Sequence, residues 1–172
     1  AGDLADMTFV ESIAPRALER FGAIDVVVNN AAWRDLVTMR EISPQSWQRT
    51  LDVCLTAPAF LSREVAKHFE SRGRGVIVNI GSIMAQQAAG FAPAYVACKG
   101  AIESLTYDLA ALYGPRGVRV VAISPGAIDT PLSREIEASL SPTADELHGF
   151  AESMTMIGRF GRADEVAAAI AW

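Results

Sequence analysis

Cysteine, histidine and long apolar runs are scarce in this sequence of 172 residues, which carries two Cys and two His. Cys54 and Cys98 lie far apart and in no metal-ligand spacing, which predicts free thiols in a reducing compartment and no metal site. No apolar run reaches the roughly 18 residues of a membrane span, and no basic, apolar export leader is visible. The net charge of −5 argues against a nucleic-acid partner. These absences predict a cytoplasmic protein.

Buried-strand patterns alternate with helical patterns along the chain. Continuous apolar runs, rich in β-branched residues, occupy residues 24–28, 76–80 and 118–123 and are typical of strands buried in a parallel sheet. Helices are expected at 8–21, 45–71, 93–113 and 162–172. This alternation predicts a single α/β domain over residues 1–172, with a doubly wound, Rossmann-like parallel sheet in three α/β/α layers.

Tyr95 and Lys99 are the strongest chemical signal in the sequence. Their spacing of four places both side chains on one face of the helix predicted over 93–113. A phenol keeps its proton up to a pH of about 10, and a neighbouring ammonium favours the phenolate. The chain has only three Tyr and two Lys, so a chance pair at this offset is expected in roughly 3% of cases. The pair therefore indicates an acid/base group.

Polar residues follow each predicted strand. Asn29 and Asn30 come after the first, Ser82 after the second, and Pro125-Gly126 after the third. Ligands of open parallel sheets bind beside the carboxyl ends of the strands, so these residues are expected near one site. A hydroxyl at Ser82 can donate a hydrogen bond to the oxygen that Tyr95 protonates.

Together, Ser82 and the Tyr95-x-x-x-Lys99 pattern resemble the signature of the short-chain dehydrogenase/reductase family. The resemblance implies that Tyr95 is the acid/base, that Ser82 polarises the carbonyl, and that Lys99 lowers the pKa of Tyr95 and binds the nicotinamide ribose. It implies hydride transfer between NAD or NADP and a secondary alcohol or ketone. It also implies a homodimer or homotetramer built through helices 45–71 and 93–113.

The same resemblance assigns residues to the cofactor. Asn30 aligns with a position beside the ribose, in a turn whose usual Gly is Ala32, whereas Asn29 mainly steadies the sheet. Asp3 and Leu4 match a pair beside the adenine ring. The predicted cofactor-binding residues are Asp3, Leu4, Asn30, Ala31, Tyr95, Lys99, Pro125, Gly126, Ile128 and Thr130.

Two departures from the family pattern stand out. The Gly-rich dinucleotide turn after a first strand is absent from these residues, as is the family's last strand, so the chain is expected to be a fragment. Cys54 stands where the family usually has Asn, which kinks the helix and holds a water behind the Lys. Two interpretations of Cys54 stay open: a weakened proton relay, or a small packed hydrophobe.

The sequence therefore predicts an oxidoreductase with a substrate lid over residues 131–156. The alternative is a non-catalytic binding or scaffold protein with a dehydrogenase-like fold, because fold alone does not establish chemistry. Intact Ser82, Tyr95 and Lys99 favour the enzyme, and the missing Gly-rich turn favours the alternative. The identity of the substrate and the choice between NAD and NADP stay open.

Overall fold

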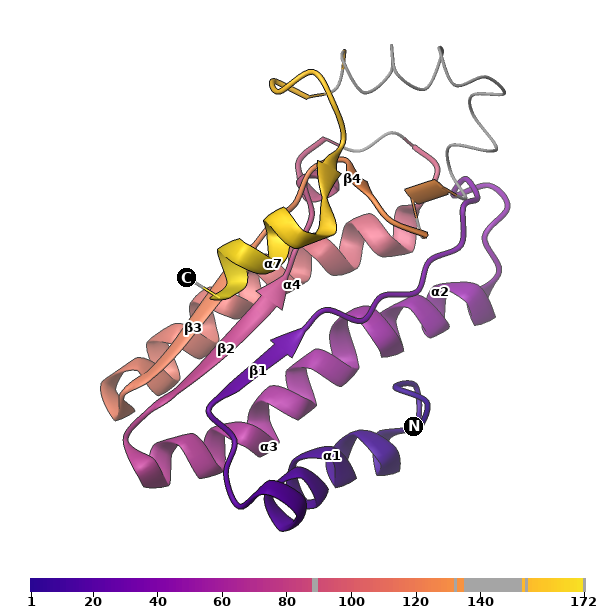
Figure 1. Ribbon diagram of the computed structural model, residues 1–172. Helices are drawn as coiled ribbons and strands as arrows, with labels where there is room; N and C mark the ends of the chain where they lie inside the picture. Colours follow the sequence, from indigo (N-terminus) through magenta and orange to yellow (C-terminus); the bar gives the residue numbers. More distant parts are fainter. Residues whose placement is uncertain (88–89, 132, 135–152, 154, 172) are drawn as a thin grey trace. The chain divides into compact units, whose positions relative to one another are not determined.

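The computed structural model describes residues 1–172 except 88–89, 132, 135–152, 154 and 172. The chain divides into two compact units, Ala1–Ile123 and Ser124–Trp172. The first unit contains the main sheet and its helices (Figure 1). The single domain expected over 1–172 stays a prediction.

Three parallel strands form the sheet of the first unit. β1 (Val26–Asn29), β2 (Gly75–Ile80) and β3 (Val118–Ile123) lie in the order β1-β2-β3. In the register, Val28 faces Val78, and Val78 faces Val121. All three predicted strands are present, with boundaries within two residues, and the predicted Rossmann-like α/β fold with a parallel sheet is confirmed.

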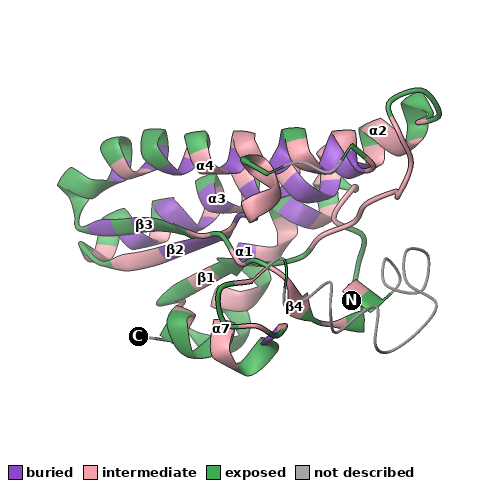
Figure 2. Ribbon diagram, turned by 90° about the horizontal axis from the view of Figure 1, so that it is seen from above, coloured by how far each residue is buried: buried purple, intermediate pink, exposed green. Residues whose placement is uncertain are grey.

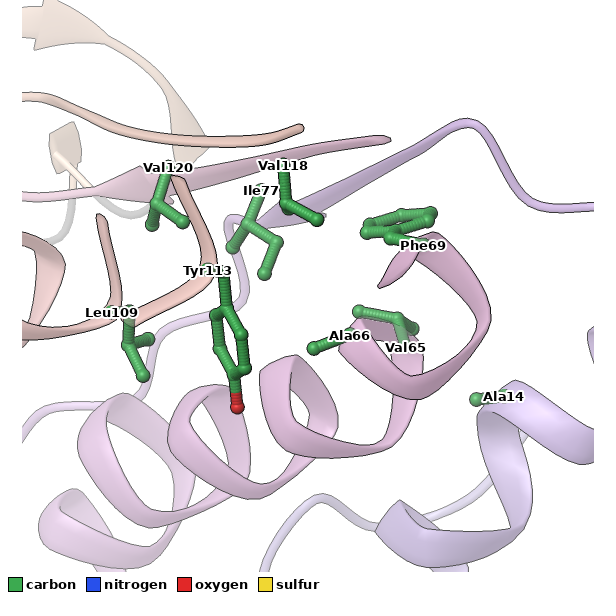
Figure 3. Packing of buried hydrophobic residues seen from close by; sticks show 9 residues of the cluster. All are labelled: Ala14, Val65, Ala66, Phe69, Ile77, Leu109, Tyr113, Val118 and Val120. Carbon is green, nitrogen blue, oxygen red and sulfur yellow. The ribbon is translucent and has the colours of Figure 1, made fainter. Parts of the chain in front are cut away.

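Two helices, α3 (Ala57–Arg72) and α4 (Pro93–Tyr113), pack against the sheet, and α1 (Met7–Phe21) packs against α3. Figure 3 shows side chains of α3 and α4 meeting those of β2 and β3. Burying an aliphatic or aromatic side chain contributes about 1.5–3 kcal/mol. Buried residues are concentrated along α3, α4 and β2 (Figure 2). The main core consists of Ala14, Val65, Ala66, Phe69, Ile77, Leu109, Tyr113, Val118 and Val120.

Local capping explains where the helices begin. Ser43 accepts a hydrogen bond from the backbone N–H of Ser46 at 3.0 Å, which caps α2 (Pro44–Leu51). The helix predicted from residue 8 begins at Met7. Its N-cap is Asp6 rather than Thr8, and the Asp6 carboxylate accepts from the N–H of Thr8 at 2.9 Å. An Asp at this position satisfies the free N–H groups better than Thr does.

The helix predicted over 45–71 is interrupted. A turn of π-helix, Asp52–Thr56, separates α2 from α3. The N–H of Ala57 bonds the carbonyl of Asp52, five residues back. Pro58 has no N–H and cannot supply the next α-helical bond. Such π-turns often occur at functional sites, and Cys54 lies within this one.

Two short helical turns and a tight bend complete the first unit. The 3₁₀ turns are Ile83–Ala85 after β2 and Gly114–Arg116 after α4. Gly117 then enters β3 with φ of 81°. A Cβ at this position would lie 2.2 Å from the carbonyl oxygen of Gly73, so only glycine fits.

The second unit contains a two-residue parallel ladder followed by a helix. β4 (Ile128–Asp129) pairs with β5 (Gly161–Arg162), and α7 (Ala163–Ala171) follows. Glu165 in the first turn of α7 accepts from the N–H of Arg162 at 2.7 Å. The helix expected over 162–172 is therefore present. Most of the predicted lid, 131–156, lies outside the described residues.

Candidate active site

Tyr95 and Lys99 lie in the first two turns of α4, on the same face of the helix. Pro93 opens the helix, where its missing N–H costs nothing. Both side chains are buried, with Tyr95 9% and Lys99 3% exposed. The ammonium nitrogen of Lys99 lies 5.3 Å from the centre of the Tyr95 ring. The predicted pairing of phenol and ammonium is therefore present in the structure.

The end of β2 holds this pair in place. Lys99 donates a hydrogen bond from its ammonium to the carbonyl of Ile80, the last residue of β2. Burial lowers the pKa of Lys99 below its ordinary value, and the thiols of Cys54 and Cys98 act in the opposite direction. Because the ammonium must be desolvated here, the hydrogen bond to Ile80 compensates part of the cost of its charge.

Ser82 follows β2 by two residues and is 8% exposed. Its Oγ caps the 3₁₀ turn by accepting from the N–H of Met84 at 3.1 Å. Burial raises the pKa of Tyr95 above its ordinary value, while a hydrogen bond with Ser82 and the charge of Arg34 act to lower it. The Tyr95-x-x-x-Lys99 pattern predicts that Lys99 lowers the pKa of Tyr95. Burial of the phenol outweighs its neighbours and reverses that direction.

Arg34 is a site residue that the sequence analysis missed. It lies in the loop after β1, and its guanidinium carbon is 5.6 Å from the centre of the Tyr95 ring. This distance is within the range of cation–π attraction. Its position four residues after Asn30, at the carboxyl end of a parallel strand, was the signal that could have indicated it.

Cys54 connects the π-turn to the same loop. Its Sγ–H donates to the carbonyl of Trp33 at 3.2 Å, and the N–H of Trp33 donates back to Sγ at 3.3 Å. The thiol is 1% exposed, and burial raises its pKa. Cys54 packs in a second buried cluster with Val53, Ala92, Tyr95 and Cys98. It is thus a core residue that also forms specific polar contacts.

The two asparagines after β1 have different surroundings. The amide of Asn29 is buried and donates to Asn79 at 2.8 Å and to Ser62 at 3.0 Å. Asn79 in turn donates to Thr106 at 2.9 Å. Asn29 therefore ties β1 to β2 and α3, which agrees with the expected role in steadying the sheet. Asn30 and the following Ala31 are exposed.

Asp3 and Leu4, expected beside the adenine ring, lie near the start of the chain. The carboxylate of Asp3 pairs with Arg49 at 2.7 Å and also accepts from the N–H of Ala5 at 2.9 Å. The hydrogen bond from Arg49 is the largest cause of the lowered pKa of Asp3. Leu4 is half-buried and packs against the cluster that contains Tyr95.

The remaining predicted cofactor residues belong to the second unit. Ile128 pairs with Gly161 in the short ladder. The N–H of Thr130 donates to the hydroxyl of Ser133 at 2.9 Å, and the Thr130 hydroxyl accepts from the N–H of Ser133 at 3.1 Å. Pro125 and Gly126 lie in the segment before β4. Their roles toward a cofactor stay predictions.

Two absences concern only the part of the chain that the structure describes. Its His, Cys, Asp and Glu residues form no group of three that could hold a metal ion. None of its helices combines the length and the apolar character that crossing a membrane requires.

Comparison with known protein families covers the whole chain. A family model described as enoyl-(acyl carrier protein) reductase matches residues 1–172. The chain is 32% identical to a cis-4-hydroxycyclohexanecarboxylate dehydrogenase of Sinomonas cyclohexanicum over 171 residues, 99% of this chain and 66% of that protein. It is 36% identical to the short-chain reductase protein NovJ of Streptomyces niveus over 168 residues, 98% of this chain and 64% of NovJ.

Solved structures agree with these relatives. A gluconate 5-dehydrogenase of Burkholderia cenocepacia, solved in complex with NADP and tartrate, superposes with a TM-score of 0.87 at 29% identity, over 98% of this chain and 64% of that one. A 4-hydroxyisoleucine dehydrogenase complexed with NADH gives 0.87 at 30% identity, over 99% and 68%. This chain thus spans about two thirds of the length of these relatives. It belongs to the short-chain dehydrogenase/reductase family.

Proposed function

We propose that the protein is an NAD(P)-dependent oxidoreductase that transfers a hydride between a nicotinamide cofactor and a secondary alcohol or ketone. The observation that carries the proposal is the grouping of Ser82, Tyr95 and Lys99, all buried, where β2 ends and α4 begins. Burying a phenol, a hydroxyl and an ammonium in one place costs free energy of folding. Groupings of this kind are typical of functional sites. The family membership supports the same chemistry.

Tyr95 exchanges a proton with the substrate oxygen. In the oxidative direction its phenolate takes the hydroxyl proton as the C–H bond is broken, and in the reductive direction its O–H protonates the forming alkoxide. Ser82 donates its hydroxyl hydrogen to the same oxygen and stabilises the charge that develops there. Ser82 also acts to lower the pKa of Tyr95, which supports placing the two groups at one substrate oxygen.

Lys99, whose ammonium nitrogen lies 5.3 Å from the centre of the Tyr95 ring, stabilises the phenolate. The bound nicotinamide cofactor supplies the hydride donor or acceptor. The residues of the first unit fit such a group, because Asn30 and Ala31 leave their surfaces exposed directly after a parallel strand. Those two residues and Lys99 would hold it. The Asp3 carboxylate already pairs with Arg49, so it would bind the cofactor only while it also holds Arg49.

Cofactor contacts from the second unit are part of the proposal. They would come from Pro125, Gly126, Ile128 and Thr130. The homodimer or homotetramer and the cytoplasmic location also stay predictions, as does the lid over 131–156.

The experiment follows nicotinamide absorbance with the full-length protein, NAD or NADP, and a panel of secondary alcohols. The names of the relatives suggest its first members: cis-4-hydroxycyclohexanecarboxylate, gluconate and 4-hydroxyisoleucine. Tyr95→Phe should lower kcat by about 10²- to 10⁴-fold, the usual contribution of a general acid/base. Tyr107→Phe is the matched control, because Tyr107 lies on the same helix and is 78% exposed.

Two outcomes would contradict the proposal. Turnover by Tyr95→Phe within a few fold of the wild type would remove Tyr95 from the chemistry. Tight cofactor binding with no turnover of any secondary alcohol or ketone would favour the non-catalytic binding protein.

A further inference from the structure

The last two residues of β2 both hold α4. The carbonyl of Ile80 accepts a hydrogen bond from the ammonium of Lys99. The side-chain amide of Asn79 donates to the hydroxyl of Thr106 at 2.9 Å. Because Lys99 and Thr106 are seven residues apart, they lie two turns apart on one face of the helix. Two attachments to adjacent strand residues set both the rotation of α4 and its position along β2.

The carbonyl of Ile80 lies at the point where the ladder between β1 and β2 ends. Successive backbone groups of a strand point to alternate neighbours. The N–H of Val76 donates to the residue before β1, whereas the N–H of Gly81 donates to Ile123 of β3. Ile80 lies an even number of residues after Val76, so its carbonyl faces the β1 side. The register of β1 ends at Asn29, opposite the residue before Ile80. Lys99 thus binds a carbonyl that lies just beyond this ladder.

Asn79 is held from both sides. Its Oδ1 accepts from the amide of Asn29 on β1 at 2.8 Å, while its own amide donates to Thr106. The hydroxyl of Thr106 donates in turn to the carbonyl of Ile102 at 2.7 Å. Asn79 is 1% exposed and Thr106 6%. Buried hydrogen bonds of this kind are strong, and leaving one unmade is costly, so the side chain of Asn79 is held in one orientation.

We propose that Asn79 is a positioning residue, which fixes the end of β2 against α4 and thereby places the Lys99 ammonium beside Tyr95. This inference rests on the proposed function, in which Lys99 stabilises the phenolate. Asn79 acts through Ile80, its neighbour in the chain, and through Thr106 on the helix. Without the amide, α4 keeps only one of its two attachments to the end of β2. A displacement of about 1 Å at a catalytic group can cost about 100-fold in rate.

The first test is kinetic and uses the full-length protein. Thr106→Val keeps the shape of the side chain but removes the acceptor for Asn79, and Asn79→Ala removes the amide itself. Both should lower kcat, by up to about 100-fold. Both should also move the pH profile of kcat/KM to higher pH, because a displaced ammonium stabilises the phenolate less. Thr106→Ser retains the hydroxyl and should restore both quantities.

A second measurement reports on Lys99 without turnover. Protein labelled with ¹³C at the lysine ε-carbon gives a resonance for Lys99, which is assigned by its loss in Lys99→Arg. Thr106→Val and Asn79→Ala should shift this resonance, since the surroundings of the ammonium change. The resonance of the exposed Lys67 should stay in place as an internal reference. Val10→Ala is the control for lost stability, because Val10 is buried on α1, which packs against α3.

The outcomes separate positioning from stability alone. Unchanged Lys99 resonances and pH profiles in folded Thr106→Val would overturn the inference, even if Asn79→Ala fails to fold. A shift of equal size in Val10→Ala would overturn it as well. If the wild type turns over no alcohol or ketone while the resonance shifts as expected, the proposed function alone is overturned.

Discussion

The ammonium of Lys99 donates its hydrogen bond to the backbone carbonyl of Ile80, the final residue of β2. This single contact joins the first turns of α4 to the sheet at the point where the chain leaves toward Ser82. Lys99 therefore has a structural role in addition to its proposed chemical one. A substitution at this position tests both roles at once.

Lys99→Arg keeps the charge but replaces a compact ammonium with a planar fork. Because the site is only 3% exposed, the larger group should strain the core and lower the free energy of unfolding by about 1–3 kcal/mol. Cofactor affinity should fall, and the pH–rate profile should move to higher pH, since the larger guanidinium cannot place its charge where the ammonium lies. Denaturant unfolding and kcat/KM across pH measure the two effects. Lys67→Arg, at an exposed position, is the control.

Substitutions at Asn29 and Asn30 should distinguish a residue that stabilises the fold from one that binds the cofactor. Asn29→Ala removes the donor to Asn79 and Ser62 and should lower the free energy of unfolding by about 1–3 kcal/mol, because buried acceptors lose their partner. Asn30→Ala alters an exposed side chain and should leave stability within about 0.5 kcal/mol while raising the KM of the cofactor. Thermal unfolding and cofactor titration of both variants suffice. Reversed effects would exchange the two assignments.

Cys54 offers a test of the proton-relay interpretation. Cys54→Ala leaves the N–H and carbonyl of Trp33 without the thiol and should cost about 1–3 kcal/mol of stability. An amide can both donate and accept, so Cys54→Asn should destabilise less and should raise turnover at neutral pH if the thiol limits proton exchange. Melting temperature and turnover are measured together. A large drop in melting temperature with no gain in rate would leave Cys54 as a packing residue.

The buried thiol of Cys98 predicts a pH dependence. Its pKa is raised from 9.0 to about 12, chiefly by burial, so the folded state keeps a proton that the unfolded state loses above pH 9.0. Its contribution to stability is therefore complete below pH 9.0 and declines as the pH rises toward about 12. Cys98→Ala should flatten the alkaline decline in denaturant unfolding. An unchanged slope between the two proteins would contradict this cause.

Thiol labelling gives an independent check on both cysteines. Native Cys54 and Cys98 should react slowly with a disulfide reagent at pH 8, because only the thiolate attacks and burial raises the pKa of both thiols, that of Cys98 to about 12. Both should react fully after unfolding. Fast labelling of the folded protein would mean that the thiols are more accessible than the structure indicates.

Much of the fold could be predicted because its signals are local. The strands at 24–28, 76–80 and 118–123 are continuous apolar runs, and each appears in the sheet. Ser43-Pro44 starts a helix by its own chemistry, and that start is confirmed. The grouping of Ser82, Tyr95 and Lys99 followed from the spacing on one helix and from the position of strand ends.

The features that sequence reasoning missed depend on contacts between distant segments. The π-turn is followed by Pro58, which has no N–H. Its Cys54 thiol contacts Trp33, which lies more than 20 residues earlier in the chain. The position of Arg34 over the Tyr95 ring depends on the path of the loop after β1, which the sequence does not specify. The net direction of the Tyr95 pKa depends on burial, and a motif alone carries no information about burial.

The π-turn at Asp52–Thr56 also bears on how related sequences should be aligned. It accommodates one more residue than a regular helical path between α2 and α3 would. A relative with a one-residue gap at this place would therefore have a continuous helix, and the side chain aligned with Cys54 would face another direction. Gaps within 52–56 are consequently informative, since they separate sequences that can anchor the loop before Arg34 from those that cannot.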